Sequence, residues 1–452
     1  MNEVPRIRPK ERDTILQSLR AGVVPRAGQH HIQVGRAAEV KALVADLERV
    51  ADGGATVRFV IGDYGSGKTF FLHLVRSIAL EKRLVTLHAD LGPERRLQGS
   101  GGQARSLYTE LLRNAATRSR PEGGAIASVV ERFITSSLEE ARTQGVSPDV
   151  VIRGRLHSLS ELVGGYDFAE VIAAYWKGHD TGNETLKSDA VRWLRGEFST
   201  RTDAKAALGV RTIVDDSNWY DLLKLLARFV KQAGYAGLLV GLDEMVNLYK
   251  LSNSKARSTN YEQVLRILND CLQGSAASFG VLFGGTPEFL MDTRRGLYSY
   301  QALQSRLAEN TFARDGLVDL TGPVIRLATL TPEDFYVLLR KLRHVYATGD
   351  EAQYLLPDEG IHAYMTHCSK RIGDDYFRTP RTTITAFVNL LAVLDQNREV
   401  PWSDLVSAVE IVRDASPDTA PTSGPGAVGD GPQGEDAQAT AATDDDLSSF
   451  RL

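Results

Sequence analysis

The sequence predicts an α/β fold in which a parallel sheet is covered by helices on both faces. Near-continuous apolar segments alternate with amphipathic helical patterns, which is typical of parallel strands buried on both faces. The predicted strands are 57–61, 84–89, 237–242, 279–285 and 324–327. The first strand is followed directly by a glycine-rich loop, 62–69, and then by a helix. This strand–loop–helix order is typical of folds that hold phosphate groups at a helix N-terminus.

The loop 62–69 fits the pattern G-x-x-x-x-G-K-[ST] without a mismatch. Its residues are Gly62, Asp63, Tyr64, Gly65, Ser66, Gly67, Lys68 and Thr69. The glycines let successive backbone N–H groups curl around a phosphate, Lys68 reaches the β- and γ-oxygens, and the Thr69 hydroxyl ligates Mg²⁺. The loop therefore predicts a site for ATP and Mg²⁺.

Polar residues follow two more of the predicted strands. Asp243 and Glu244 come directly after strand 237–242. Ligands of open α/β sheets bind at the carboxyl ends of the strands, so Asp243 is expected to hold Mg²⁺ beside Thr69. Glu244 is then placed to polarise the attacking water. Thr286 follows strand 279–285 and has two interpretations, a hydrogen bond to the γ-phosphate or the attacking water, or a helix N-cap.

Helical patterns fill the rest of the chain and divide it into six regions. The division predicts a lead-in (1–33) with a helix over 12–20, a first core part (34–119), a helical insertion (120–218) with a charged, mobile stretch near 201–205, a second core part (219–330), a helical lid (331–414) and a disordered acidic tail (415–452). Within the core, helices are predicted over 37–52, 104–116, 221–232 and 261–272. The tail is rich in small and polar residues, so it buries too little surface to offset its ordering entropy.

Composition indicates a protein of the cytoplasm without a membrane span. The net charge is −4; the tail carries −6 of it, which leaves +2 for the body. No apolar run approaches the ~20 residues that span a bilayer, and the first residues lack the apolar region of a secretory signal. Cys271 and Cys368 are predicted to be buried thiols. The terminal stretch 444–452 mixes acidic and apolar residues, which is consistent with a docking peptide or with a solubilising tail.

Several of these motifs occur in the order found in AAA+ ATPases. Residues 34–36 (Val-Gly-Arg), the loop 62–69, the acidic pair 243–244, Thr286, residues 305–307 (Ser-Arg-Leu) and residues 379–381 (Thr-Pro-Arg) resemble most the branch that contains the origin-recognition proteins. By this resemblance Thr286 is a sensor-1 residue, Arg306 an arginine finger that acts on ATP in a neighbouring subunit, and Arg381 a sensor-2 residue in the lid. A homo-oligomer is therefore implied. Arg294, Arg295 and Arg314 are alternatives to Arg306, and Arg378 is an alternative to Arg381.

A narrower resemblance covers about residues 10–400. The strings at 19–25 (LRAGVVP), 62–70 (GDYGSGKTF), 234–239 (GYAGLL), 260–262 (NYE), 285–289 (GTPEF) and 296–300 (GLYSY) are similar to those of the ATP-binding proteins of bacteriophage exclusion (BREX) loci, of the BrxD type. The resemblance implies an anti-phage role, often beside a helicase partner.

One departure from the origin-recognition pattern concerns DNA. The region 331–414 is large enough for a lid but not for a winged-helix domain, and no basic recognition helix follows it. Arginine-rich patches (Arg192, Arg195 and Arg201; Arg340, Lys341 and Arg343) offer non-specific phosphate contacts or are solvated helix faces. The sequence and the resemblance together favour Mg²⁺-dependent ATP hydrolysis that drives or gates an assembly in bacterial anti-phage defence. The alternatives are a slowly hydrolysing nucleotide switch or scaffold and a DNA-loading or remodelling ATPase of replication type.

Overall fold

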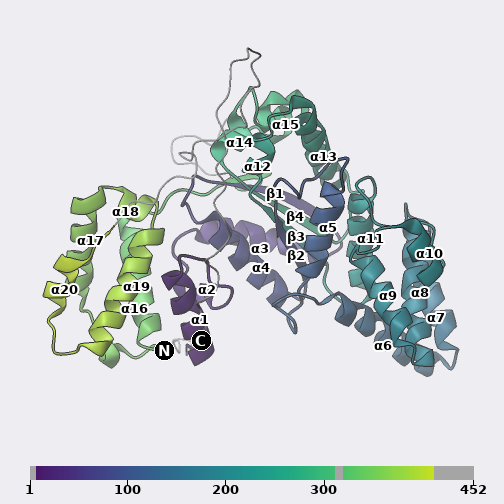
Figure 1. The fold of residues 1–452 in the computed structure, drawn as a ribbon, viewed down its shortest axis with the longest axis horizontal. Helices are drawn as coiled ribbons and strands as arrows, with labels where there is room; N and C mark the ends of the chain where they lie inside the picture. Colours follow the sequence, from purple (N-terminus) through teal and green to yellow (C-terminus); the bar gives the residue numbers. More distant parts are fainter. Residues whose placement is uncertain (1–6, 311–318, 412–452) are drawn as a thin grey trace, which may run out of the picture. The chain divides into compact units, whose positions relative to one another are not determined.

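The core of the protein is a five-stranded parallel sheet (Figure 1). The computed structural model describes residues 7–310 and 319–411. The strands are β1 (Ala55–Ile61), β2 (Val85–Asp90), β3 (Leu238–Asp243), β4 (Phe279–Gly285) and β5 (Val324–Arg326), in the order β2-β3-β4-β1-β5 across the sheet. The predicted α/β class and all five predicted strands are confirmed, with shifts of one or two residues at the strand ends.

The described residues also form twenty α-helices and two short 3-10 helices. Those before β3 are α1 (Pro9–Arg20), α2 (Gln29–Ile32), α3 (Ala37–Ala51), α4 (Lys68–Glu81), α5 (Gln103–Arg113), α6 (Ile126–Gln144), α7 (Pro148–Ser160), α8 (Gly165–Thr181), α9 (Glu184–Leu194), α10 (Arg201–Leu208) and α11 (Trp219–Gln232). Those after β3 are α12 (Val246–Tyr249), α13 (Ser254–Leu272), α14 (Pro287–Met291), η1 (Leu297–Ser299), α15 (Gln301–Leu307), α16 (Pro332–Tyr346), η2 (Glu351–Gln353), α17 (Asp358–Ile372), α18 (Asp375–Arg378), α19 (Arg381–Gln396) and α20 (Trp402–Ala408).

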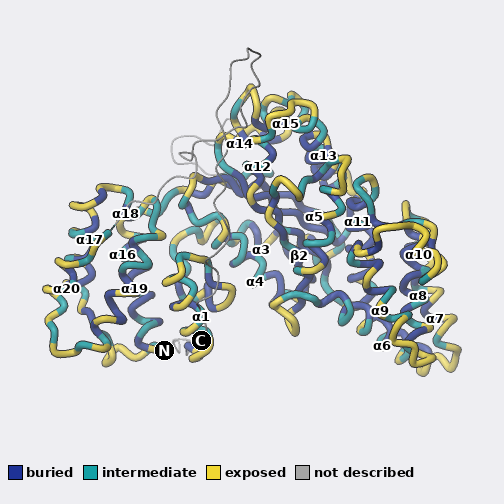
Figure 2. The backbone as a smooth tube through the Cα atoms, in the orientation of Figure 1, coloured by how far each residue is buried: buried dark blue, intermediate teal, exposed yellow. Residues whose placement is uncertain are grey.

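The two faces of the sheet bury different sets of side chains. Because side chains alternate along a strand, Phe59 of β1 packs on one face and Val60 on the other. The Phe59 face is covered by α5, α11 and α13, and the Val60 face by α3 and α4. The strands are accordingly buried along nearly their whole length, whereas exposed residues lie on the outer surfaces of the helices (Figure 2). Burial on both faces explains why the sequence of each strand is a nearly continuous run of apolar residues.

Helices α6 to α10 lie within residues 120–218 and share a core with one face of the sheet. Phe133 and Phe168 both pack against Phe229 of α11, with ring centroids 5.1 and 5.5 Å away. The stretch near 201–205, which was expected to be charged and mobile, carries exposed charged side chains and forms the start of helix α10. The Thr200 side chain caps this helix and Ala204 is fully buried, which the charge pattern alone did not reveal.

The first helices of the chain pack into the core of the 331–411 region. Ile15 of α1 and Ile32 of α2 are buried in one cluster with Phe335, Leu339 and Leu391. The Thr385 hydroxyl of α19 also donates a 2.7 Å hydrogen bond to the backbone carbonyl of Leu19. Residues 7–32 are therefore part of a packed core and not only a lead-in.

Three further predictions have different outcomes. Cys271 and Cys368 are buried free thiols, as predicted, and burial raises the pKa of both to about 12. No helix among the described residues has the length and apolar character that crossing a membrane requires. The acidic tail 415–452 and its terminal stretch 444–452 lie outside the described residues.

A buried ion pair between β1 and α3 should matter more than an exposed one nearby. Arg58 donates to Asp46 at 2.5 Å, and both residues are almost fully buried. Arg58→Met leaves the buried Asp46 carboxylate with only the 3.9 Å contact to the exposed Arg49, so we expect a loss of about 3–5 kcal/mol in the free energy of unfolding. The matched control is Lys82→Met, which breaks the solvent-exposed Lys82–Glu48 pair and should cost at most about 1 kcal/mol. Urea unfolding measures both, and equal losses would contradict the expectation.

Candidate active site

The glycine-rich loop joins β1 to α4 and takes the backbone shape that its sequence requires. Gly65 and Gly67 have φ angles of +80° and +79°, in the left-handed region that favours glycine, and Gly67 is the N-cap of α4. Lys68, the first residue of α4, donates from Nζ to the carbonyls of Gly62 and Asp63 at 2.8 and 2.9 Å. The loop thus presents an ammonium group and a helix N-terminus at one place, an arrangement that attracts anions.

Asp243 links the loop to the acidic end of β3. One carboxylate oxygen accepts a 2.8 Å hydrogen bond from the Thr69 hydroxyl, and the other accepts a 2.8 Å bond from the backbone N–H of Glu244. A hydroxyl and a carboxylate held together are oxygen ligands of the kind that Mg²⁺ prefers. Thr69 and Asp243 therefore fit the predicted metal ion.

Glu244 sits in a strained backbone position beside the carboxylate of Asp243. Its φ angle is +58°, which is uncommon for a residue other than glycine and costs on the order of 1 kcal/mol or more. Burial raises the pKa of Glu244, and the negative charges of Asp243 and Asp90 raise it further, while Lys68 opposes the shift. A carboxylate with a raised pKa is a better proton acceptor at neutral pH than an ordinary one.

Asp90 is a third carboxylate at the same edge of the sheet, and sequence reasoning missed it. It ends β2 and stands opposite Asp243 in the strand register. Burial raises the pKa of Asp90, and the charge of Asp243 adds to the effect. Asp90 directly follows the predicted strand 84–89, so the signal that indicated Asp243 was present here too. Three acidic groups gathered in this way favour a bound cation.

Two histidines near the acidic residues stay uncharged. His73 of α4 and His88 of β2 line a small cavity together with Thr69 and Asp243. Burial is the main reason that the pKa of His73 is lowered to about 4 and that of His88 to about 3, and the positive charge of Arg76 contributes to both values. Neutral imidazoles do not compete with a metal ion for the Asp243 carboxylate.

Arg36 holds the loop from outside, a role that the sequence did not indicate. Its guanidinium donates to the backbone carbonyl of Ser66 and, at 3.2 Å, to that of Ala328. Arg36 itself is a left-handed N-cap of α3, with φ +58°. This one side chain therefore ties the glycine-rich loop to the segment that follows β5.

An apolar pocket opens beside the loop. Residues 64–69 and Glu244 form its polar side. Its apolar wall comes from three parts of the chain and includes Val24, Pro25, Ile32, Val34, Leu338 and Ile384. A pocket with one charged and one apolar side fits a nucleotide, because the phosphates and the base need opposite surroundings. The contribution of residues 19–34 was not predicted as part of a site.

Arg381 lines this pocket, whereas its alternative does not. Arg381 is the first residue of α19, and Thr379 two residues earlier lies against the loop, where a Cβ on Gly65 would come within 3.0 Å of its methyl carbon. Arg378 instead forms an exposed 3.5 Å ion pair with Asp374 and is not among the residues that line the pocket.

Thr286 follows the strand next to β1, whereas Arg306 lies on the surface of α15. Strand β4 lies between β1 and β3, so Thr286 at its end lies between the loop strand and the strand of the acidic pair. Its hydroxyl accepts from the backbone N–H of Phe289 at 3.4 Å, which is the N-cap interpretation. Arg306 is exposed on α15, donates to the carbonyl of Ala302 at 2.9 Å, and does not line the pocket. The alternative Arg314 lies outside the described residues.

Gly284 leaves the space that the Asp243 carboxylate occupies. A Cβ at position 284 would come within 2.3 Å of Asp243 Oδ1 and 2.8 Å of Leu72 Cδ1. Gly284→Ala should therefore displace the carboxylate and weaken Mg²⁺-dependent nucleotide binding at least about tenfold, the scale of losses when groups supporting a metal ligand are removed. Gly280→Ala on the same strand is the control, since its Cβ would meet only side-chain ends, the nearest being Leu239 Cδ1 at 3.0 Å. Titration of a fluorescent nucleotide with Mg²⁺ measures both, and equal affinities would contradict the expectation.

Comparison with known proteins identifies the family. A comparison with curated protein sequences gave no significant match. A family described as "BREX system ATP-binding protein BrxC/D" matches residues 7–410, which include the loop, the acidic pair and the pocket wall. The match covers nearly the whole chain, and its description agrees with a site built for a nucleotide. The protein therefore belongs to the BrxC/BrxD family of BREX system ATP-binding proteins.

Proposed function

We propose that the protein binds and hydrolyses ATP with Mg²⁺ and uses hydrolysis to drive or gate assembly of an anti-phage defence complex on DNA. The observation that carries the proposal is the 2.8 Å hydrogen bond between the Thr69 hydroxyl and Asp243, because it joins the phosphate loop to the acidic end of the sheet. Family membership supports the use of ATP in a BREX system. Hydrolysis, Mg²⁺ and the assembly are our inference.

The proposed reaction assigns a role to each group of the site. The N–H groups of the loop and Lys68 bind the β- and γ-phosphates, while Thr69 and Asp243 hold the metal. The metal ion supplies positive charge against the charge that develops on the phosphates. Glu244 takes a proton from a water as its oxygen attacks the γ-phosphorus, and the bond to the β,γ-bridging oxygen breaks, releasing ADP and phosphate. Thr286 and Arg381 orient the water and the γ-phosphate.

We further place the chain within the AAA+ ATPases and the BrxD type. The central position of β4 supports this placement, because Thr286 then lies between the phosphate loop strand and the acidic strand. The proposal includes a homo-oligomer in the cytoplasm in which Arg306 acts on a neighbour's ATP. We also propose that the chain is divided into the six regions described above, with boundaries after residues 33, 119, 218, 330 and 414.

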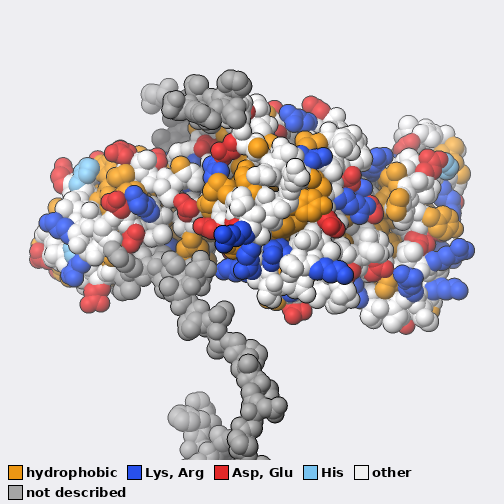
Figure 3. All heavy atoms as spheres, turned by 90° about the horizontal axis from the view of Figure 1, so that it is seen from above, with side chains coloured by type: hydrophobic (Ala, Val, Ile, Leu, Met, Phe, Trp, Pro, Cys, Tyr) orange, Lys and Arg blue, Asp and Glu red, His pale blue; other side chains and the backbone are white. Residues whose placement is uncertain are grey.

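Contact with DNA is assigned to a partner such as a helicase. Arg343 is 4% exposed and bonds the Asp358 carboxylate at 2.6 Å, so its patch does not offer three free cations. In the other patch Arg192 pairs with Asp189 and Arg201 pairs with Asp215. On the face drawn in Figure 3, acidic side chains lie among basic ones over much of the surface, and one group of Lys and Arg side chains gathers near its middle. Pairing of this kind weakens attraction to a phosphate backbone.

Glu244→Gln tests hydrolysis directly. The variant keeps Thr69 and Asp243, so it should bind ATP with near-normal affinity, while turnover should fall by about 10²-fold or more because the proton acceptor is gone. Phosphate release and nucleotide titration measure the two properties separately. The control is Glu288→Gln, since Glu288 also acts on Lys68 electrostatically but is exposed on α14. Turnover of Glu244→Gln within a few-fold of wild type would favour the slow nucleotide switch.

Arg306→Ala tests whether neighbouring subunits complete each other's sites. The variant should bind nucleotide normally and turn it over about 10³-fold more slowly, the scale of an arginine finger. Lys68→Ala should fail to bind ATP but still carries an intact Arg306. A mixture of the two should regain activity, because one supplies the pocket and the other the arginine. Light scattering must show that the two co-assemble; if they do and no activity returns, Arg306 does not act between subunits.

A further inference from the structure

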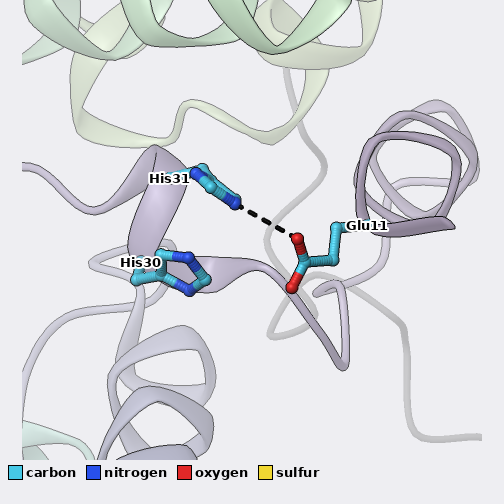
Figure 4. A group of neighbouring side chains, drawn as sticks. All are labelled: Glu11, His30 and His31. Atoms are coloured by element: carbon cyan, nitrogen blue, oxygen red, sulfur yellow. Dashed lines mark hydrogen bonds and ion pairs between the residues drawn. The ribbon is translucent and has the colours of Figure 1, made fainter. Parts of the chain in front are cut away.

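A cluster of three metal-ligating side chains lies away from the phosphate loop, between α1 and α2. Glu11 comes from α1, and His30 and His31 are adjacent residues of α2. Their ligand atoms all lie within 4.8 Å of one another, and His31 Nε2 is 3.5 Å from a carboxylate oxygen of Glu11. Figure 4 shows the three side chains facing a common space between the two helices.

The backbone holds the two helices close enough for this arrangement. Gly28, the N-cap of α2, has φ +76°, and a Cβ there would come within 2.8 Å of Ile15 and 3.4 Å of Glu11. A larger residue at position 28 would push α2 away from α1. The neighbouring Gln29 is buried and donates to the backbone carbonyl of Pro25 at 2.7 Å, which fixes the start of α2.

The chemistry of the three groups favours one class of ion. Two imidazoles and one carboxylate form a donor set that binds Zn²⁺, with a fourth position for water. Imidazole ligands also suit neighbouring transition metals, whereas Mg²⁺ and Ca²⁺ prefer oxygen ligands alone.

We propose that Glu11, His30 and His31 form a binding site for one Zn²⁺ ion that clamps α1 to α2. An ordinary Glu–His ion pair accounts for Glu11 and His31, but it leaves His30 unexplained beside them. The His30 and His31 rings lie 3.9 Å apart between centroids, so a single ion can reach both after small side-chain movements. The site does not depend on the proposed ATPase activity.

The position of α2 gives the clamp a structural consequence. The Ser77 hydroxyl of α4 donates to the Gln29 side chain at 2.9 Å, and Ile32 lies in the core that includes α16. Ile32 also lines the pocket beside the phosphate loop. An ion bound at the cluster would therefore hold a wall of that pocket in place, and it should stabilise the folded protein because it binds the unfolded chain more weakly.

Calorimetric titration of the full chain with Zn²⁺ tests the proposal, with untagged protein and excess Mg²⁺ to fill the oxygen-ligand sites. We expect one Zn²⁺ per chain with micromolar affinity and a rise in melting temperature. His30→Ala and Glu11→Gln should each weaken binding at least about tenfold, since even groups that only support a ligand cost 10–100-fold. His30 is exposed, so its truncation should not impair folding, and the melting temperature without Zn²⁺ verifies this.

The matched control is His157→Ala, which removes a histidine from the exposed His157–Glu161 pair, a pair that belongs to no cluster of three metal-ligating side chains among the residues that the structure describes. Its Zn²⁺ affinity should equal that of the wild type. The proposal is overturned if the wild type takes up no Zn²⁺ at high micromolar concentration. It is equally overturned if folded His30→Ala and Glu11→Gln bind Zn²⁺ as tightly as the wild type.

Discussion

The carboxylate of Asp243 is the group on which the arrangement of the site depends. It accepts hydrogen bonds from the Thr69 hydroxyl and from the Glu244 backbone, so it connects the helix after the loop with the turn that carries Glu244. Only a residue without a Cβ fits beside it, which explains the glycine at position 284, near the carboxyl end of β4. The phosphate loop is positioned by β1, but its relation to the acidic residues is set through this one side chain.

The site also contains unfavourable features that have a common explanation. Asp90, Asp243 and Glu244 bring three carboxylates to one edge of the sheet, and Glu244 adds a left-handed backbone conformation. Strain and like-charge repulsion of this kind are tolerated where function demands them, and a divalent cation would relieve the repulsion.

The sequence predicts those features whose pattern lies within a short stretch of residues, and it does not predict contacts between residues that are far apart in the chain. The loop and the five strands could be predicted because the pattern of each lies within about ten residues. The parallel sheet then brings the carboxyl ends of the strands together. The roles of Arg36 and of residues 19–34 could not be read in this way. Arg36 reaches Ser66 and Ala328, which are distant in the sequence, and no spacing rule predicts such a contact. Helix α10 was not predicted because most of its first residues are charged, and only one buried alanine, Ala204, and the N-cap Thr200 indicate a packed helix.

The packing of α1 and α2 into the core of the 331–411 region changes what the lid can do. A lid made only of residues after 331 could move over the nucleotide as a separate body. Here Ile15 and Ile32 belong to its core, and the segment that joins them to α3 also lines the nucleotide pocket. Any movement of α16 or α19 must therefore displace residues 19–34 as well, or break that core. Arg36 stands at the junction, since it bonds both the loop and the segment leading to α16. In the function proposed above, a change at the γ-phosphate would therefore reach α1 through residues 19–34, because these residues line the pocket and lie next to the core that α1 and α2 share with α16 and α19.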